Sequence, residues 1–167
     1  RLFKLLSRYY QATISCIHEH QGTVMQLVGD SIFAIWNAPK RQENHQALAC
    51  RGAWALRQCL RQFNEETKDT YDDALETRLG LHAGDASVGN LGSEDRFEFA
   101  AIGANTNLAS RLEGLNKHLG TEVLMSEEML TAAEASGFLC RPLGRFKFKG
   151  LDRVVKVFEL AEEKAAS

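Results

Sequence analysis

The chain has 167 residues, a formal net charge of −2, a hydrophobic fraction of 44% and a charged fraction of 25%. This length fits one domain with its own core, and the two fractions are typical of a soluble globular protein. The net charge does not indicate a general nucleic-acid-binding surface or a surface for anionic membranes.

The four cysteines fall in no CxxC or other metal-type spacing, and each lies among apolar residues: Cys16, Cys50, Cys59 and Cys140. We expect buried free thiols in a reducing compartment. No apolar run approaches a membrane span and no signal peptide is visible, so a cytoplasmic location is predicted. Because the sequence starts at Arg1 already in a helical pattern, we interpret it as a domain of a longer protein with an upstream sensor or membrane domain.

The first part of the chain is predicted to form a helix followed by a β-hairpin. Apolar residues at helical spacing run from Leu2 to about Glu19, and Gly22 ends this helix. Two strands follow, Thr23–Val28 and Ser31–Trp36, joined by a tight turn at Gly29-Asp30.

The middle of the chain combines a long helix with a glycine-rich segment. The helix runs from about Asn44 to Asn64, and a polar loop, Lys68–Asp73, leads to a strand at Thr77–Ala83. The glycine-rich residues 84–93 are neither a Walker loop nor a dinucleotide fingerprint, because they lack GK[ST] and lie between strands. We interpret them as a bulged hairpin that leads to a strand at Phe97–Ala101.

A third helix is predicted from Ile102 to about His118, followed by a short strand, Thr121–Ser126. The next helix, Glu127–Ala135, has Ser126 as its expected N-cap.

The tail, Phe138–Leu160, alternates in the manner of strands, with Arg145–Lys149 and Val154–Leu160 as a pair. The order αββαββαβαβββ, with one strand lost before Arg1, predicts an α+β fold. Helices would pack on a mainly antiparallel sheet in a ferredoxin-like sandwich. The domain would cover residues 1–160 and residues 161–167 would form a polar tail.

Asn107 and Arg111 are the first candidates for chemistry. They are four residues apart, so at about 100° per residue they lie within roughly 40° of each other on one helix face. Leu108, Leu112 and Leu115 cluster on a face roughly 90° away, which would be buried. An amide and a guanidinium held side by side suit a sugar and a phosphate. The alternative is a solvated face of an ordinary amphipathic helix.

Asp30 and Lys149 are weaker candidates when taken alone. Asp30 lies at the tip of the predicted hairpin, and a hard cation such as Mg²⁺ prefers one or two carboxylates plus substrate phosphate oxygens. A plain turn aspartate is the alternative. Lys149, followed by Gly150 before the last strand, is either a phosphate contact or a surface lysine.

Four segments resemble the catalytic domains of class III adenylate and guanylate cyclases of the bacterial type, in their order and spacing. They are QGTVMQLVGDSIFAIWNAP (21–39), TRLGLHAGDASVGNLGS (77–93), IGANTNLASRLE (102–113) and FKGLDRVVKVFEL (148–160). The resemblance implies a ferredoxin-like fold that cyclises a nucleoside triphosphate. The 3′-hydroxyl attacks the α-phosphate and pyrophosphate is released.

The resemblance also implies roles for individual residues. Asp30 matches the second of two aspartates that bind Mg²⁺ or Mn²⁺, and Gly29 beside it belongs to the substrate site. Asn107 matches the asparagine that orients the ribose, and Arg111 matches the arginine that stabilises charge on the α-phosphate. Lys149 lies in the element associated with the triphosphate tail. The first metal aspartate of the family lies on a strand upstream of this chain.

Homodimerisation is implied as well, with the sites at a head-to-tail interface. Asp30 would come from one copy, and Asn107 with Arg111 from the other. A symmetric dimer would then carry two equivalent sites.

The chain departs from the family pattern at the positions that read the purine. Gln26 stands where a lysine or glutamate is usual, and Ala100 where Asp, Thr or Cys is usual. Gly103-Ala104 replaces a frequent Gly-Asp, and Leu151 replaces a second lysine. Gln26 can still hydrogen-bond a purine edge. Nothing at these positions favours guanine, so ATP is the predicted substrate and GTP the alternative.

The resulting prediction is an adenylate cyclase that serves as the output domain of a signalling protein. The principal alternative is a catalytically degenerate cyclase fold that dimerises or binds nucleotide without turnover. An RNA-binding ferredoxin-like domain is set aside, because the central strands are aliphatic and the net charge is negative.

Overall fold

The computed structural model describes residues 2–72 and 74–165, which fall into two compact units, Arg1–Thr77 and Arg78–Ser167. Of the predicted segments, Asp73 in the polar loop and residues 166–167 of the polar tail lie outside the described residues. The predicted α+β fold is confirmed, since among the described residues strand pairing is antiparallel in every pair except one.

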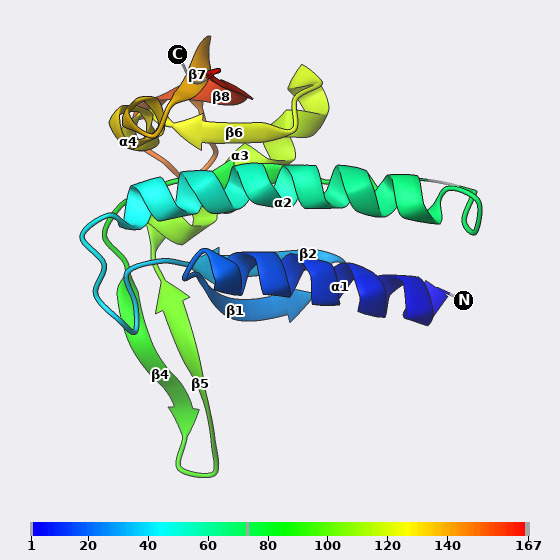
Figure 1. Ribbon diagram of the computed structural model, residues 1–167. Helices are drawn as coiled ribbons and strands as arrows, with labels where there is room; N and C mark the ends of the chain where they lie inside the picture. The colour runs from blue at the N-terminus through cyan, green and yellow to red at the C-terminus, as the bar shows by residue number, and fades with distance from the viewer. Residues whose placement is uncertain (1, 73, 166–167) are drawn as a thin grey trace. The chain divides into compact units, whose positions relative to one another are not determined.

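The first unit combines two long helices with a β-hairpin. Its elements are α1 (Leu2–Glu19), β1 (Thr23–Val28), β2 (Ser31–Ile35) and α2 (His45–Thr67). The two helices run side by side (Figure 1). Trp36 ties the hairpin to the end of α1, because its indole Nε1 donates a hydrogen bond of 2.8 Å to the carbonyl of His20. The predicted helices and hairpin are therefore present, with α2 extending past the predicted end at Asn64.

The second unit contains a four-stranded sheet and a separate hairpin. Its elements are β3 (Leu79–Leu81), β4 (Ser87–Ser93), β5 (Arg96–Ile102), α3 (Ala104–Leu119), β6 (Val123–Ser126), the 3₁₀ helix η1 (Glu127–Met129), α4 (Leu130–Ala135), β7 (Phe138–Lys147) and β8 (Val154–Glu163). The sheet has the order β3-β6-β8-β7, in which only β3 and β6 are parallel.

Helix α3 packs on this sheet through its leucine face. Leu108 and Leu112 form one buried cluster with Leu124 of β6 and with Val155 and Val157 of β8. Burying such side chains contributes about 1.5–3 kcal/mol each, which is enough to hold the helix in place. The helix that was predicted from leucine spacing is thus fixed by that same leucine face.

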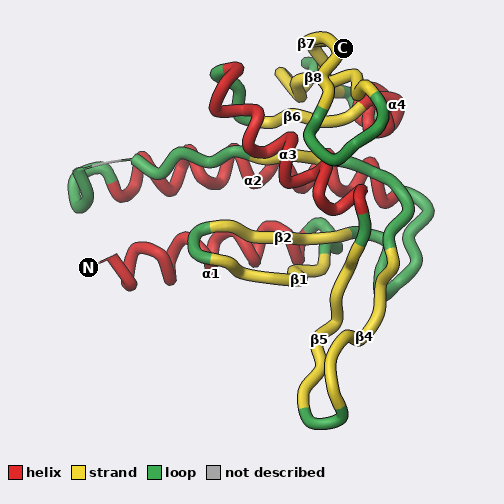
Figure 2. The backbone as a smooth tube through the Cα atoms, turned by 180° about the vertical axis from the view of Figure 1, so that it is seen from behind, coloured by secondary structure: helices red, strands yellow, loops and turns green. Residues whose placement is uncertain are grey.

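The glycine-rich segment forms one arm of a regular hairpin. β4 pairs with β5 from Ser87↔Ile102 to Ser93↔Arg96 without a shift of register, so the hairpin is confirmed and the predicted bulge is wrong. Figure 2 shows the two strands side by side up to their connecting turn. Gly92 is the reason for the close pairing there, because a Cβ at this position would lie 2.2 Å from the carbonyl oxygen of Arg96.

The tail contains two strands where the sequence predicted three. β7 runs without interruption to Lys147 and pairs with β8, which continues to Glu163 beyond the predicted end at Leu160. A shift of register between Pro142 and Gly144 marks a bulge, and Gly144 has a φ of +115°. The bulge accommodates Pro142 and Gly144 within the strand, so β7 continues through it.

Ser126 does not cap the following helix with a side-chain hydrogen bond, contrary to prediction. Its hydroxyl lies 2.6 Å from Nδ1 of His82, and this tertiary contact replaces the local cap. The helix also begins as the 3₁₀ turn η1, before α4.

Gly80 lets α3 lie directly against β3. A Cβ at this position would lie 2.3 Å from the carbonyl oxygen of Ala109 and 2.4 Å from the amide nitrogen of Glu113. Because both atoms belong to the helix backbone, we expect Gly80→Ala to lower the free energy of unfolding by about 1–3 kcal/mol. Gly114→Ala, on the same helix with open space at its Cβ, should instead raise it by about 0.5–1 kcal/mol. Urea unfolding checks both values, and equal effects would contradict this packing.

No helix among the described residues is long and apolar enough to cross a membrane. The four cysteines are free thiols; Cys16 and Cys50 are buried, whereas Cys59 and Cys140 are half-buried. Burial raises the pKa of the Cys16 thiol to about 11. Such a thiol stays protonated and unreactive near neutral pH.

Candidate functional site

The exposed face of α3 carries the two polar residues that the helical spacing predicts. Asn107 and Arg111 are exposed, while Leu108 and Leu112 between and beside them are 1% and 0% exposed. The leucines fix the rotation of the helix about its axis. The amide and the guanidinium therefore have a defined direction, away from the core.

The start of α3 is set by the backbone at Gly103. This residue has a φ of +147°, which L side chains rarely adopt, so glycine is required for the sharp turn from β5 into the helix. Thr106 supports the first turn, because its hydroxyl donates a hydrogen bond of 2.7 Å to the carbonyl of Gly103. The free amide groups of a helix N-terminus favour anions nearby.

Lys149 is placed by a tight turn between β7 and β8. The amide of Leu151 donates a 3.1 Å hydrogen bond to the carbonyl of Phe148, and Gly150 has a φ of +89°, as the third residue of a type II turn requires. Phe148 and Leu151 both pack on the cluster around Leu108. The two apolar residues hold the turn, and Lys149 between them is exposed.

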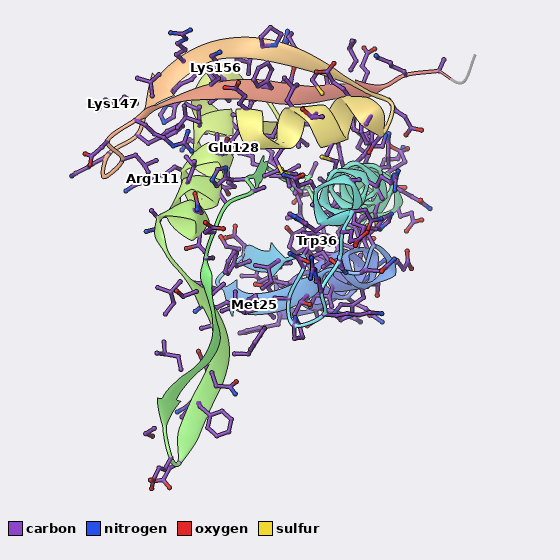
Figure 3. All side chains as sticks on the ribbon, turned by 90° about the vertical axis from the view of Figure 1, so that its left-hand side faces the viewer. Met25, Trp36, Arg111, Glu128, Lys147 and Lys156 are labelled. Carbon is purple, nitrogen blue, oxygen red and sulfur yellow. The ribbon has the colours of Figure 1, made fainter. Side chains whose placement is uncertain are left out.

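These two elements enclose one pocket of about 390 Å³. Its lining residues come from α3 and from the β7–β8 turn: Ala104, Asn107, Leu108, Ser110, Arg111, Lys149, Gly150 and Leu151. Figure 3 shows Arg111 on α3. Two of the lining side chains are cationic and none is acidic, so the pocket favours an anion such as a phosphate.

Three of the predicted site residues thus meet in a single pocket: Asn107, Arg111 and Lys149. Ala104 and Ser110 also line it and were not predicted as site residues. Ala104 could have been predicted from the sequence, because a residue three positions before Asn107 lies on the same helix face. The pocket contact of Ser110 depends on the position of the β7–β8 turn, which the sequence does not reveal.

The other predicted residues lie elsewhere in the fold. Asp30 and Gly29 form the exposed tip of the β1–β2 hairpin, where Gly29 has a φ of +58°. Gln26 is exposed on β1, next to a bulge at Met25 that shifts the register between the strands. Such bulges change the direction of neighbouring side chains and are frequent beside active sites. Ala100 is half-buried on β5, opposite Gly89.

Asp30 suits a hard cation as one ligand of several. Its carboxylate is an oxygen donor on an exposed turn, and Mg²⁺ is commonly held by one or two carboxylates plus substrate phosphates. Among residues 2–72 and 74–165, no group of three or more His, Cys, Asp or Glu side chains forms a metal site. Oxygen atoms of a substrate phosphate would suit as further ligands of a metal at Asp30.

The sequence model described as "Adenylate and Guanylate cyclase catalytic domain" matches residues 1–161. The chain belongs to this family. The family predicted from the four sequence segments is therefore confirmed, and the pocket beside α3 lies in a cyclase domain.

Known cyclases are similar to this domain in both sequence and structure. Adenylate cyclase 1 of Rhizobium meliloti is 38% identical over 93% of this chain, which spans 23% of that relative's length. The crystal structure of the adenylyl cyclase CyaB of P. aeruginosa has a TM-score of 0.88 and 26% identity, covering 98% of this chain and 83% of that chain. A guanylyl cyclase structure has a TM-score of 0.81 and 28% identity, covering 95% of this chain and 79% of that chain. Proteins named adenylyl cyclase and guanylyl cyclase thus share this fold.

Proposed function

We propose that this domain forms 3′,5′-cyclic AMP and pyrophosphate from ATP, as the output domain of a longer signalling protein. The observation that carries the proposal is the pocket on α3, in which Asn107, Arg111 and Lys149 surround a space free of acidic side chains. Cyclisation needs the 3′-hydroxyl to be held in line with the α-phosphate while negative charge is stabilised. These are the tasks of positioned polar and cationic groups.

Each pocket residue has one task in this proposal. The Asn107 amide orients the ribose so that its 3′-hydroxyl faces the α-phosphate. The Arg111 guanidinium donates hydrogen bonds to the phosphate oxygens as their charge develops in the transition state. Lys149 binds the triphosphate tail and the leaving pyrophosphate. Within the described part of the chain neither Arg111 nor Lys149 forms an ion pair, so both charges are available to a substrate.

Asp30 would hold Mg²⁺ or Mn²⁺ in this reaction, together with phosphate oxygens and an aspartate upstream of the chain. A bound divalent ion supplies Lewis-acid stabilisation of the phosphate oxygens and makes the 3′-hydroxyl easier to deprotonate. Asp30 itself fixes where that ion binds. The tight turn with Gly29 holds the carboxylate at the end of two paired strands.

A homodimer would bring the two sets of residues together, with Asp30 of one copy facing Asn107 and Arg111 of the other. The β4–β5 hairpin supports this arrangement, because every residue of β4 is exposed and apolar side chains lie along both strands. These exposed side chains are Val88, Leu91, Phe97 and Ile102. An exposed apolar surface of this kind is typical of an interaction site.

ATP is preferred over GTP in this proposal on two grounds. Gln26 can donate to and accept from a purine edge through its amide, whereas Ala100 offers no polar group. The Rhizobium relative carries the name adenylate cyclase. Because a pocket discriminates bases mainly through hydrogen bonds, we expect a modest preference for ATP.

A cyclisation assay on the full-length protein tests this proposal. With Mg²⁺ or Mn²⁺, we expect cyclic AMP from ATP at a higher kcat/KM than cyclic GMP from GTP, measured by chromatography of the products. A folded dimer that binds nucleotide and forms neither product would contradict the proposal. That outcome would favour a degenerate regulatory module, for which the departures from the family pattern at Gln26, Ala100 and Leu151 are the sequence argument.

A further inference from the structure

A buried histidine links the end of β3 to the start of α3. The His82 side chain is 1% exposed, and both of its ring nitrogens have partners. Nε2 lies 2.7 Å from Oδ1 of Asn105, in the first turn of α3. Nδ1 lies 2.6 Å from the hydroxyl of Ser126, at the end of β6. His82 therefore bridges the helix and the sheet through its two opposite ring atoms.

The direction of the hydrogen bond between His82 and Asn105 follows from the second hydrogen bond of the Asn105 side chain. The amide Nδ2 of Asn105 donates a hydrogen bond of 2.7 Å to the backbone carbonyl of Asp85. A carbonyl can only accept, so the Asn105 amide nitrogen faces Asp85 and its oxygen faces His82. That oxygen also can only accept. Nε2 of His82 must therefore carry the proton and donate it to Asn105.

The contact of Nδ1 with Ser126 can form in two ways, and both leave the hydrogen bond from Nε2 to Asn105 unchanged. The Ser126 hydroxyl can donate to Nδ1, or accept from it, because a hydroxyl does both. Glu128 lies beyond, with a carboxylate oxygen 3.8 Å from Nδ1, and Arg153 pairs with the same carboxylate at 3.0 Å. In either arrangement Nε2 donates to Asn105, so the contact with α3 is constant.

The amide group of Asn105 lies directly against Gly84. A Cβ at Gly84 would lie 2.4 Å from the amide of Asn105, so only glycine fits there. At the other end of α3, the Asn116 amide donates a 2.9 Å hydrogen bond to the carbonyl of Leu79. Hydrogen bonds thus connect both ends of helix α3 to β3 or to the residue after it. The hydrogen bond of His82 is the one at the pocket end of the helix.

We propose that His82 is a positioning residue for catalysis, which sets Asn107 and Arg111 by holding the first turn of α3 through Asn105. This inference rests on the proposed roles of Asn107 and Arg111. Asn105 and Asn107 are two residues apart in the opening turns of α3, so a displacement of the backbone at Asn105 also displaces Asn107. An error of about 1 Å in the position of a reacting group can cost about 10²-fold in rate.

Two substitutions of His82 separate positioning from general stability in the full-length protein. The amide nitrogen of a glutamine can occupy the place of Nε2, whereas asparagine reaches only the place of Nδ1. We expect His82→Asn to lower kcat by about 10–100-fold with KM for ATP within about threefold of wild type. His82→Gln should keep kcat within about threefold of wild type, because its amide still donates to Asn105.

Thr121→Val serves as the matched control. The Thr121 hydroxyl donates a buried hydrogen bond of 2.7 Å to Asn116, at the far end of the same helix. Losing this bond should lower the melting temperature while kcat stays unchanged. If His82→Asn and His82→Gln had equal kcat, or if Thr121→Val reduced kcat as much as His82→Asn, the positioning role would be overturned.

Amide hydrogen exchange tests the role of His82 without relying on the proposed catalytic activity. His82→Asn should speed exchange at residues 104–111 relative to His82→Gln, while residues 112–119 exchange alike in both variants. Equal exchange at residues 104–111 would overturn the proposal whether or not the protein cyclises ATP. A folded protein that showed this difference in exchange but formed neither cyclic nucleotide would overturn the proposed function alone.

Discussion

Arg111→Ala is expected to lower kcat for cyclisation by about 10²–10³-fold, the usual loss when one donor to a transition-state oxyanion is removed. The guanidinium is exposed on α3 and lines the pocket with Lys149, so its removal leaves the buried leucine face intact. The melting temperature should therefore stay close to that of wild type. Steady-state kinetics with ATP measures the effect, and circular dichroism on heating confirms the fold.

Two further variants show whether the loss of kcat in Arg111→Ala comes from the lost geometry of the guanidinium or from the lost charge alone. Arg111→Lys keeps the charge but loses the planar fork that matches phosphate oxygens, so most of the loss in kcat should remain. Lys117→Ala removes a cation from the exposed last turn of the same helix, outside the pocket, and should leave kcat unchanged. An Arg111→Ala variant with kcat within threefold of wild type would contradict the role of the guanidinium.

Asp30→Ala is expected to lower metal-dependent turnover by at least about 10²-fold, because the carboxylate at the hairpin tip would no longer hold the cation. Asp30→Asn should lower metal-dependent turnover by a similar factor, since asparagine keeps the shape of the side chain without its charge. Asp30 is exposed on a turn, so neither variant should change the melting temperature. Activity as a function of Mn²⁺ concentration measures the effect.

Mixing the two inactive variants tests the dimer directly. A heterodimer of Asp30→Ala with Arg111→Ala has one site that combines the intact Asp30 of one copy with the intact Arg111 of the other. With random exchange at equal amounts, about a quarter of wild-type activity should return. Asp30→Ala mixed with Asp30→Asn should stay inactive, because no intact combination exists. Absence of recovery in mixtures shown to exchange subunits would contradict a shared site.

The sequence predicted α3 and its polar face well because the relevant information is local. Leu108 and Leu112 recur at helical spacing, and the structure buries them against β6 and β8. Once the leucine face is buried, the directions of Asn107 and Arg111 follow from helix geometry. The tight turn at Gly29-Asp30 was predictable for the same reason, since a two-residue turn depends on its own residues.

The sequence predicted less well where a distant partner decides the structure. The glycines of β4 indicated a bulge, but pairing with β5 keeps the strand regular. Serine is a preferred N-cap residue, yet the hydroxyl of Ser126 contacts His82, forty-four positions earlier. A local pattern cannot show that contact, because it forms only when β3 and β6 lie in one sheet.

The sequence by itself determined the family, the helical face with Asn107 and Arg111, and the turn that carries Asp30. These features depend on short spacings and on residue types, which a single chain displays directly. Only the tertiary structure decided that Lys149 shares a pocket with that face, and that His82 holds the start of α3. Both contacts join residues far apart in sequence, and such contacts form only when buried apolar surfaces bring the elements together.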